Sequence, residues 1–209
     1  MADVAKVPRS LPLALLYPVF FLSGMAAILY QLVWQRSLFT LYGTSSESVT
    51  VVVTAFMLGL GLGSLAGGWL SERPGISLPV VFGLVELAIG LFGIVSLPFF
   101  GWLASWTSGA AGIEVGVAAM GAVVVPTLLM GATLPLLVAH QVRESGNVGQ
   151  SVGQMYFINT LGSAAGAFLA AAVLMGALGQ SRSVWLAAAL NFVVAGLVLG
   201  AFLKFRTRR

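Results

Sequence analysis

The residue of this chain most able to do chemistry is Glu86, a carboxylic acid inside a long apolar run. An ionised carboxylate in the middle of a bilayer is costly unless it is paired, hydrated or protonated. Glu86 could therefore bind a cationic amine or relay a proton. The alternative is a neutral glutamic acid that joins helices through hydrogen bonds to Asn159, Thr160 or Asn191. Both interpretations are open at the level of the sequence.

Other polar and aromatic side chains lie within apolar runs and are candidates for the same site. Tyr30, Gln31 and Trp34 end the first run, where they could form the rim of a cavity. We favour anchoring at the membrane interface for these residues, because Trp and Tyr are enriched there. Buried amides such as Asn159 commonly join helices. The candidate substrate-binding residues are Glu86, Tyr30, Gln31, Trp34, Asn159 and Asn191.

The glycines of the second apolar run raise the question of a nucleotide loop. Gly61-x-Gly63-x-x-Ala66 is close to a dinucleotide fingerprint, which requires a short strand before the glycines and a polar helix after them. These glycines instead lie inside an apolar run long enough to cross a bilayer. A repeat of every fourth residue places small residues on one stripe of a helix, where a second helix can approach closely. The predicted helix-packing glycines are Gly59, Gly63, Gly67, Gly162 and Gly166.

The composition is that of an integral membrane protein. Hydrophobic residues make up 59% of the 209 residues and charged residues 8%, and the mean hydropathy is +1.02. Without cysteine and with a single histidine, the sequence offers no thiolate and little scope for zinc, so we expect no metal site and no cofactor. The net charge of +4 does not indicate nucleic-acid binding, since four of the ten basic residues lie in residues 204–209.

Six transmembrane spans can be drawn, so the predicted fold is an all-α membrane bundle. They are Leu13–Trp34, Val49–Leu70, Leu78–Leu103, Val115–Val138, Val152–Ala177 and Val184–Leu203. Residues 1–12 form a cytoplasmic segment, residues 13–203 the transmembrane domain and residues 204–209 a basic cytoplasmic tail. With both termini cytoplasmic, all basic residues except Arg36 and Arg182 lie inside, as the positive-inside rule requires. The predicted location is the bacterial cytoplasmic (inner) membrane.

A weak internal repeat suggests how the spans are arranged. The segment "LGSLAGGWL" of the second span resembles "LGSAAGAFL" of the fifth, and Asn191 of the sixth is a plausible counterpart of Glu86 of the third. Because three spans cross the membrane an odd number of times, two such triplets must be inverted relative to each other. A 3+3 inverted repeat is the plan of many transporter halves.

Longer stretches resemble a known family. "FMLGLGLGSLAGGWLSER", "PTLLMGATLPLL" and "YFINTLGSAAGAFLAAAVLMGALG" together resemble the membrane domain of bacterial spermidine-synthase-like proteins, in which a major facilitator part is fused to a synthase. The resemblance implies half of a major facilitator transporter. Fused members continue into a soluble aminopropyltransferase domain, which we expect to be missing from this chain. We therefore expect this chain not to be an enzyme.

One connecting loop is similar to a motif of major facilitator transporters. In those proteins it lies between the second and third helices, on the cytoplasmic side, and usually carries Asp where this chain has Glu72. The motif residues are Gly68, Glu72, Arg73 and Gly75.

These observations lead to a leading hypothesis and two alternatives. The leading hypothesis is a transport or binding protein for a small, possibly cationic, polyamine-like metabolite; the substrate class follows from the family resemblance alone. The alternatives are a structural or assembly subunit of a larger membrane complex, and a membrane anchor for a separate synthase. The expected partners are the lipid bilayer and a second copy of the chain or other membrane subunits.

Overall fold

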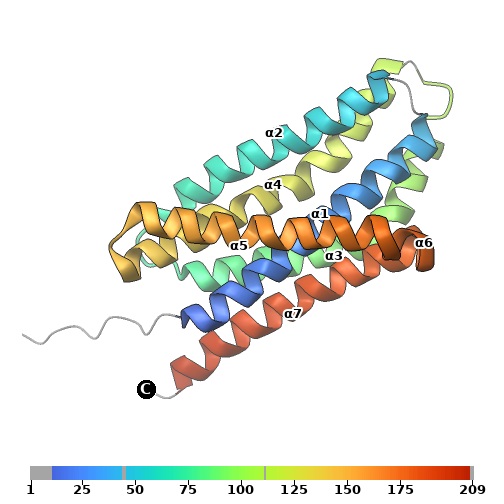
Figure 1. Ribbon diagram of the computed structural model, residues 1–209. Coiled ribbons are helices and arrows are strands. Elements are labelled where there is room, and N and C mark those ends of the chain that lie inside the picture. The colour runs from blue at the N-terminus through green and yellow to red at the C-terminus, as the bar shows by residue number, and fades with distance from the viewer. Residues whose placement is uncertain (1–10, 44–45, 111, 208–209) are drawn as a thin grey trace, which may run out of the picture.

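The computed structural model describes residues 11–43, 46–110 and 112–207, and these residues form a bundle of long helices (Figure 1). Residues 1–10 of the expected N-terminal segment and residues 208–209 of the expected basic tail lie outside this description. The helices are α1 (Leu13–Tyr42), α2 (Ser46–Ser71), α3 (Leu78–Trp106), α4 (Gly112–Ser145), α5 (Val148–Leu169) and α7 (Gly179–Thr207). Helix α5 continues through a π-helical turn, η1 (Ala170–Leu174), into the short α6 (Met175–Ala177).

Six segments of the described residues are long and apolar enough to cross a membrane, which confirms the expected all-helical membrane bundle. They are Leu13–Thr40, Thr50–Ser71, Leu78–Trp106, Ile113–Ser145, Val148–Ala177 and Gly179–Lys204. Even the shortest, with 22 residues, reaches about 33 Å at a rise of about 1.5 Å per residue. In the absence of water such segments form helices because every backbone group must find a partner within the segment.

Several helices extend beyond the predicted spans. Helix α1 continues past Trp34 to Tyr42, and α4 continues past Val138 to Ser145. The apolar runs mark only the part of a helix that lies in hydrocarbon, whereas the helix itself ends where the backbone can turn. Four of the five connections between long helices contain a glycine with positive φ, namely Gly43, Gly75, Gly109 and Gly146. The fifth leads into Gly179, the first residue of α7, whose φ is also positive.

The closest helix pair is α2 with α4, and glycines make this approach possible. A Cβ on Gly63 would overlap the backbone of Leu128, and one on Gly67 would meet Ala132 at 2.7 Å. In return, Gly131 of α4 lies against the backbone of Leu60. Gly59 also faces α4, where a Cβ would overlap the side chain of Thr127.

Helix α5 packs on α1 in the same manner. A Cβ on Gly162 would overlap the backbone of Phe21, and one on Gly166 would lie 2.8 Å from the carbonyl oxygen of Met25. Gly24 of α1 lies against the backbone of Asn159. Both glycine stripes are therefore occupied by helices of the same chain. Neither stripe therefore offers a free surface to a second protein chain. The expected homodimer, or association with other membrane subunits, stays a prediction.

Helices α3 and α7 pack on each other and complete the bundle, with α3 also against α4 and α7 also against α1. Two apolar clusters fill its two ends. One contains Trp34 and Ile89, and the other contains Leu16 and Phe82. On α3, Glu86 lies between Phe82 of one cluster and Ile89 of the other. Glu86 is therefore in the middle of the bundle, where the two apolar clusters meet.

Candidate functional site: a polar layer in the middle of the bundle

Glu86 is fully buried and is held by two neighbouring helices. The hydroxyl of Ser23 on α1 donates to Oε1 at 2.5 Å, and the side-chain amide of Asn191 on α7 donates to Oε2 at 2.5 Å. Among the described residues no Lys, Arg or His forms an ion pair with this carboxylate. The carboxyl group thus joins three helices through neutral hydrogen-bond donors.

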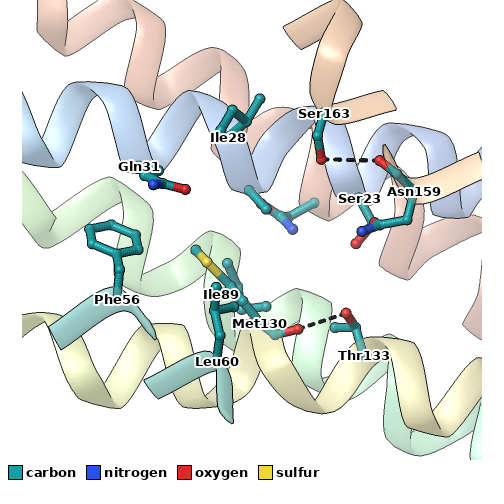
Figure 2. Close-up of a pocket in the computed structure, with 12 residues that line it drawn as sticks. Ser23, Ile28, Gln31, Phe56, Leu60, Ile89, Met130, Thr133, Asn159 and Ser163 are labelled. Carbon is teal, nitrogen blue, oxygen red and sulfur yellow. Dashed lines mark hydrogen bonds between the residues drawn. The ribbon is translucent and has the colours of Figure 1, made fainter. Parts of the chain in front are cut away.

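A cavity of about 150 Å³ lies beside this carboxyl group (Figure 2). All six long helices contribute to its wall, which places it between the α1–α5 pair and the α2–α4 pair, with α3 and α7 behind it. Half of the twelve lining residues are polar and uncharged. These six are Ser23, Gln31, Thr133, Asn159, Ser163 and Asn191.

Several polar groups of the cavity have acceptor oxygens left over. Ser163 donates its hydroxyl to the carbonyl oxygens of Gly24 and Asn159, both at 3.0 Å, and Thr133 donates to that of Met130 at 2.7 Å. Their hydroxyl protons are therefore used within the protein, and their oxygen lone pairs remain. Asn191 Oδ1 is buried and has no hydrogen-bond partner among the described residues. Such an orphaned acceptor costs free energy unless a ligand or water meets it.

Figure 2 shows how the lining is distributed. Gln31 and Phe56 lie at one end of the cavity, whereas Ser23, Asn159, Ser163 and Thr133 lie at the other. Glu86 itself does not line the cavity, but both of its hydrogen-bond donors, Ser23 and Asn191, do. Glu86 therefore acts on the cavity through these two side chains.

Tyr30 and Trp34 lie elsewhere than the sequence suggested. Both side chains are fully buried, with ring centroids 4.8 Å apart, and neither lines the cavity. The indole N–H of Trp34 donates to Ser96 Oγ at 2.9 Å, so the polar end of the ring has a partner inside the protein. Interfacial anchoring is therefore wrong for these two residues. Of the aromatic rings that contact Trp34, that of Phe56 lines the cavity, with ring centroids 6.2 Å apart.

The four residues of the loop motif lie at or beyond the end of α2, away from the cavity. Glu72, Arg73 and Gly75 are exposed, and the guanidinium of Arg73 lies 4.0 Å from the ring centroid of Trp69. Arg143 at the end of α4 donates to the carbonyl oxygen of Ser71 at 2.5 Å. This contact ties the ends of α2 and α4 together and satisfies a carbonyl of the last turn of α2.

The structure brings together Glu86, Gln31, Asn159 and Asn191 from the predicted set and adds three hydroxyl groups. Ser23 and Ser163 were not predicted, because serine in a helix usually bonds its own backbone and carries little signal. Thr133 lies between Pro126 and Pro135 on α4 and was not among the predicted substrate-binding residues. Among the described residues no group of three His, Asp or Glu side chains could hold a metal ion.

Comparison with known proteins gives two curated relatives, both from Streptomyces coelicolor. "Polyamine aminopropyltransferase 1" is 26% identical over 190 residues, and "Polyamine aminopropyltransferase 2" is 29% identical over 197 residues. Each alignment covers 90% of this chain but only 34% of the relative, so the chain spans about a third of the length of these proteins. No protein-family profile and no solved structure matches the chain.

These relatives correct one expectation. Both are named as enzymes, which contradicts the expectation that the chain is not an enzyme. That expectation rested on the lack of a synthase domain within these residues, and the similarity of the membrane part to named aminopropyltransferases outweighs it. The described residues contain six helices long and apolar enough to cross a membrane, and the chain is similar, over nine-tenths of its length, to one third of each of two polyamine aminopropyltransferases.

Proposed function

We propose that this chain is the membrane domain of a protein related to polyamine aminopropyltransferases, and that its central cavity binds an ammonium group of a small linear amine for transport across, or delivery at, the membrane. The observation that carries this proposal is the orphaned acceptor Asn191 Oδ1, which lines a cavity next to the buried carboxylate of Glu86.

The chemistry of the cavity favours a cation with several N–H donors. An ammonium group has three donors and no acceptor, so it needs a wall of oxygens. Asn191 Oδ1 supplies one, and the amide oxygens of Gln31 and Asn159 can supply others. None of the described residues that line the cavity is positively charged, so none repels a cation there. Glu86 contributes negative charge through Ser23 and Asn191.

The size of the cavity favours a thin ligand. Its 150 Å³ equals roughly five waters at about 30 Å³ each, and it is smaller than the roughly 300 Å³ or more of pockets for drug-sized ligands. An extended amine with a terminal ammonium group matches such a space better than a bulky or planar ligand. The apolar part of the lining, which includes Phe56, Ile89 and Met130, suits the methylene groups of such a chain.

In this proposal the bundle is half of a major facilitator transporter, built from the inverted triplets α1–α2–α3 and α4–α5–α7. The glycine contacts support it. In the α2–α4 pair, Gly63 lies against Leu128 and Gly131 lies against Leu60. In the α1–α5 pair, Gly162 lies against Phe21 and Gly24 lies against Asn159. Each pair of contacts is equivalent under the exchange of α1 with α4 and α2 with α5.

The packing of whole helices supports the same symmetry. The exchange of α1 with α4, α2 with α5 and α3 with α7 converts the α2–α4 pair into α5–α1 and the α3–α4 pair into α7–α1. Substrate sites of inverted-repeat transporters lie near the bilayer midplane between the repeats. The cavity is lined by both triplets, as this plan requires. We place the domain in the bacterial cytoplasmic membrane with both termini inside.

Amine binding by the purified chain in lipid nanodiscs tests this function. Isothermal titration with spermidine is expected to give saturable binding, which Gln31→Leu and Asn159→Leu weaken by roughly tenfold each through the loss of a hydrogen bond to a charged group. Gln35→Leu is the matched control, because Gln35 lies one turn from Gln31 but does not line the cavity. Equal weakening by Gln31→Leu and Gln35→Leu, or no binding at all, would overturn the proposal.

A second role, as the membrane anchor of an aminopropyltransferase activity, is favoured by the length of the relatives. Two thirds of each relative lie outside the matched region, and their names describe an enzyme. An anchor alone needs no polar cavity. Saturable, Gln31-dependent amine binding therefore favours a substrate-handling domain, whereas retention of a soluble synthase without amine binding favours the anchor.

A further inference from the structure

Within the part of the chain that the structure describes, the Glu86 carboxylate has no counter-charge. It is fully buried, and both of its oxygens meet neutral groups. An uncompensated charge in such surroundings is strongly unfavourable, so the carboxyl group must be balanced either by a proton or by a cation brought from outside. The adjoining cavity is the place where such a cation can approach it.

The two oxygens of Glu86 differ in what they can accept. The amide NH₂ of Asn191 can only donate, so Oε2 is fixed as an acceptor. A hydroxyl can donate or accept, so Ser23 can donate to a carboxylate and can equally accept from a protonated carboxyl group. A proton on Glu86 therefore belongs on Oε1, facing Ser23, which is also a residue of the cavity wall.

From this geometry we propose that Glu86 exchanges a proton for the ammonium group of the ligand, with Ser23 and Asn191 as positioning residues. This inference rests on the proposed amine binding. In the empty cavity the proton sits on Oε1 and is shared with Ser23. When an ammonium group enters and donates a hydrogen bond to Asn191 Oδ1, the proton on Glu86 Oε1 leaves through the cavity to water. One cation enters and one proton departs, so the net charge of the site does not change.

The other titratable groups around Glu86 are few. Helix α1 presents Tyr30, which is two turns of helix from Ser23 and whose buried hydroxyl has no hydrogen-bond partner among the described residues. Helices α4 and α7, which also pack on α3, carry their charged and titratable residues toward their ends. These residues are Glu114, His140, Arg143, Glu144, Arg182, Lys204 and Arg206. Glu86 is therefore the acidic group among the described residues in the middle of the bundle.

Proton release during amine binding tests the exchange. The full chain in nanodiscs is titrated with spermidine at one pH in two buffers that differ in ionisation enthalpy. For the wild type, the difference in apparent binding enthalpy is expected to correspond to about one proton released per amine bound. Glu86→Gln should release none and bind roughly tenfold more weakly. Glu114→Gln removes an exposed acid and should keep the release.

Glu86→Gln is expected to fold, because its amide can donate to Ser23 and accept from Asn191 in the same positions. Ser23→Ala offers a second variant, which keeps the carboxyl group but removes the partner of Oε1 and should reduce the release.

An infrared difference spectrum of the amine-free protein gives an independent readout. The carbonyl band of a protonated carboxyl group should be present in the wild type, vanish on addition of spermidine and be missing in Glu86→Gln. Amine binding without proton release, or with a spectrum that Glu86→Gln leaves unchanged, overturns the exchange and leaves the binding function standing. The absence of any amine binding overturns both proposals, and the binding heat itself distinguishes this result from failure of the exchange alone.

Discussion

Asn191 on α7 donates its side-chain amide to Glu86 Oε2 at 2.5 Å, and this bond joins two helices in the middle of the bundle. Replacing Asn191 by Leu keeps a similar volume but leaves a buried carboxyl oxygen without its donor. We expect Asn191→Leu to lower the free energy of unfolding in detergent by about 1–3 kcal/mol. Chemical or thermal unfolding followed by circular dichroism measures this change.

A double-mutant cycle separates the hydrogen bond from general packing. Glu86→Leu combined with Asn191→Leu should cost less than the sum of the two single changes, because neither partner is then left unpaired. Strict additivity would show that the two side chains do not support each other, contrary to the contact described here.

The sequence predicted Glu86 and Asn191 at mid-span, with a hydrogen bond between them as one alternative, but not Ser23, the second partner of Glu86. Periodicity and hydropathy locate spans along the chain, and they placed Glu86, Asn159 and Asn191 inside them. They contain no information on which face of α1 meets α3, so Ser23 remained one serine among many. Trp34 was assigned to the interface by frequency, whereas the hydroxyl of Ser96 allows the ring to be buried. Long-range side-chain pairing, rather than span location, is what the sequence could not supply.

The burial of Trp34 predicts different environments for the tryptophans. In variants that keep one tryptophan each, the fluorescence of Trp102, which is 59% exposed, should be quenched by brominated lipid or by an aqueous quencher. The fluorescence of Trp34, which is 0% exposed, should respond to neither. Strong quenching of Trp34 fluorescence by the aqueous quencher would mean that this side chain lies at the membrane interface, which would contradict its hydrogen bond to Ser96.

The sidedness proposed from the basic residues can be tested directly, because the chain contains no cysteine. Ser108 after α3 and Ser145 at the end of α4 are both exposed, and α4 separates them. An impermeant thiol reagent added to intact cells should label Ser108→Cys and not Ser145→Cys. The reverse pattern would place both termini outside, and labelling of both would argue against α4 as a span.

Equivalent glycines give a test of the inverted repeat. Gly24 and Gly131 occupy matching positions in α1 and α4, and each lies against a backbone carbonyl of the paired helix, that of Asn159 or that of Leu60. A methyl group at either position requires the two backbones to separate, which removes packing along the whole pair. We therefore expect Gly24→Ala and Gly131→Ala to lower stability in detergent by similar amounts, about 1–3 kcal/mol each.

Gly61 is the matched control, since no atom lies within 4 Å of a Cβ built there. Gly61→Ala should be neutral, or should stabilise α2 by up to about 1 kcal/mol through helix propensity. A large loss for only one of Gly24→Ala and Gly131→Ala would mean that the α1–α5 and α2–α4 pairs are not equivalent. Because the inverted-triplet proposal depends on that equivalence, the repeat would then be a chance likeness among small residues, and the cavity would have to be explained without symmetry.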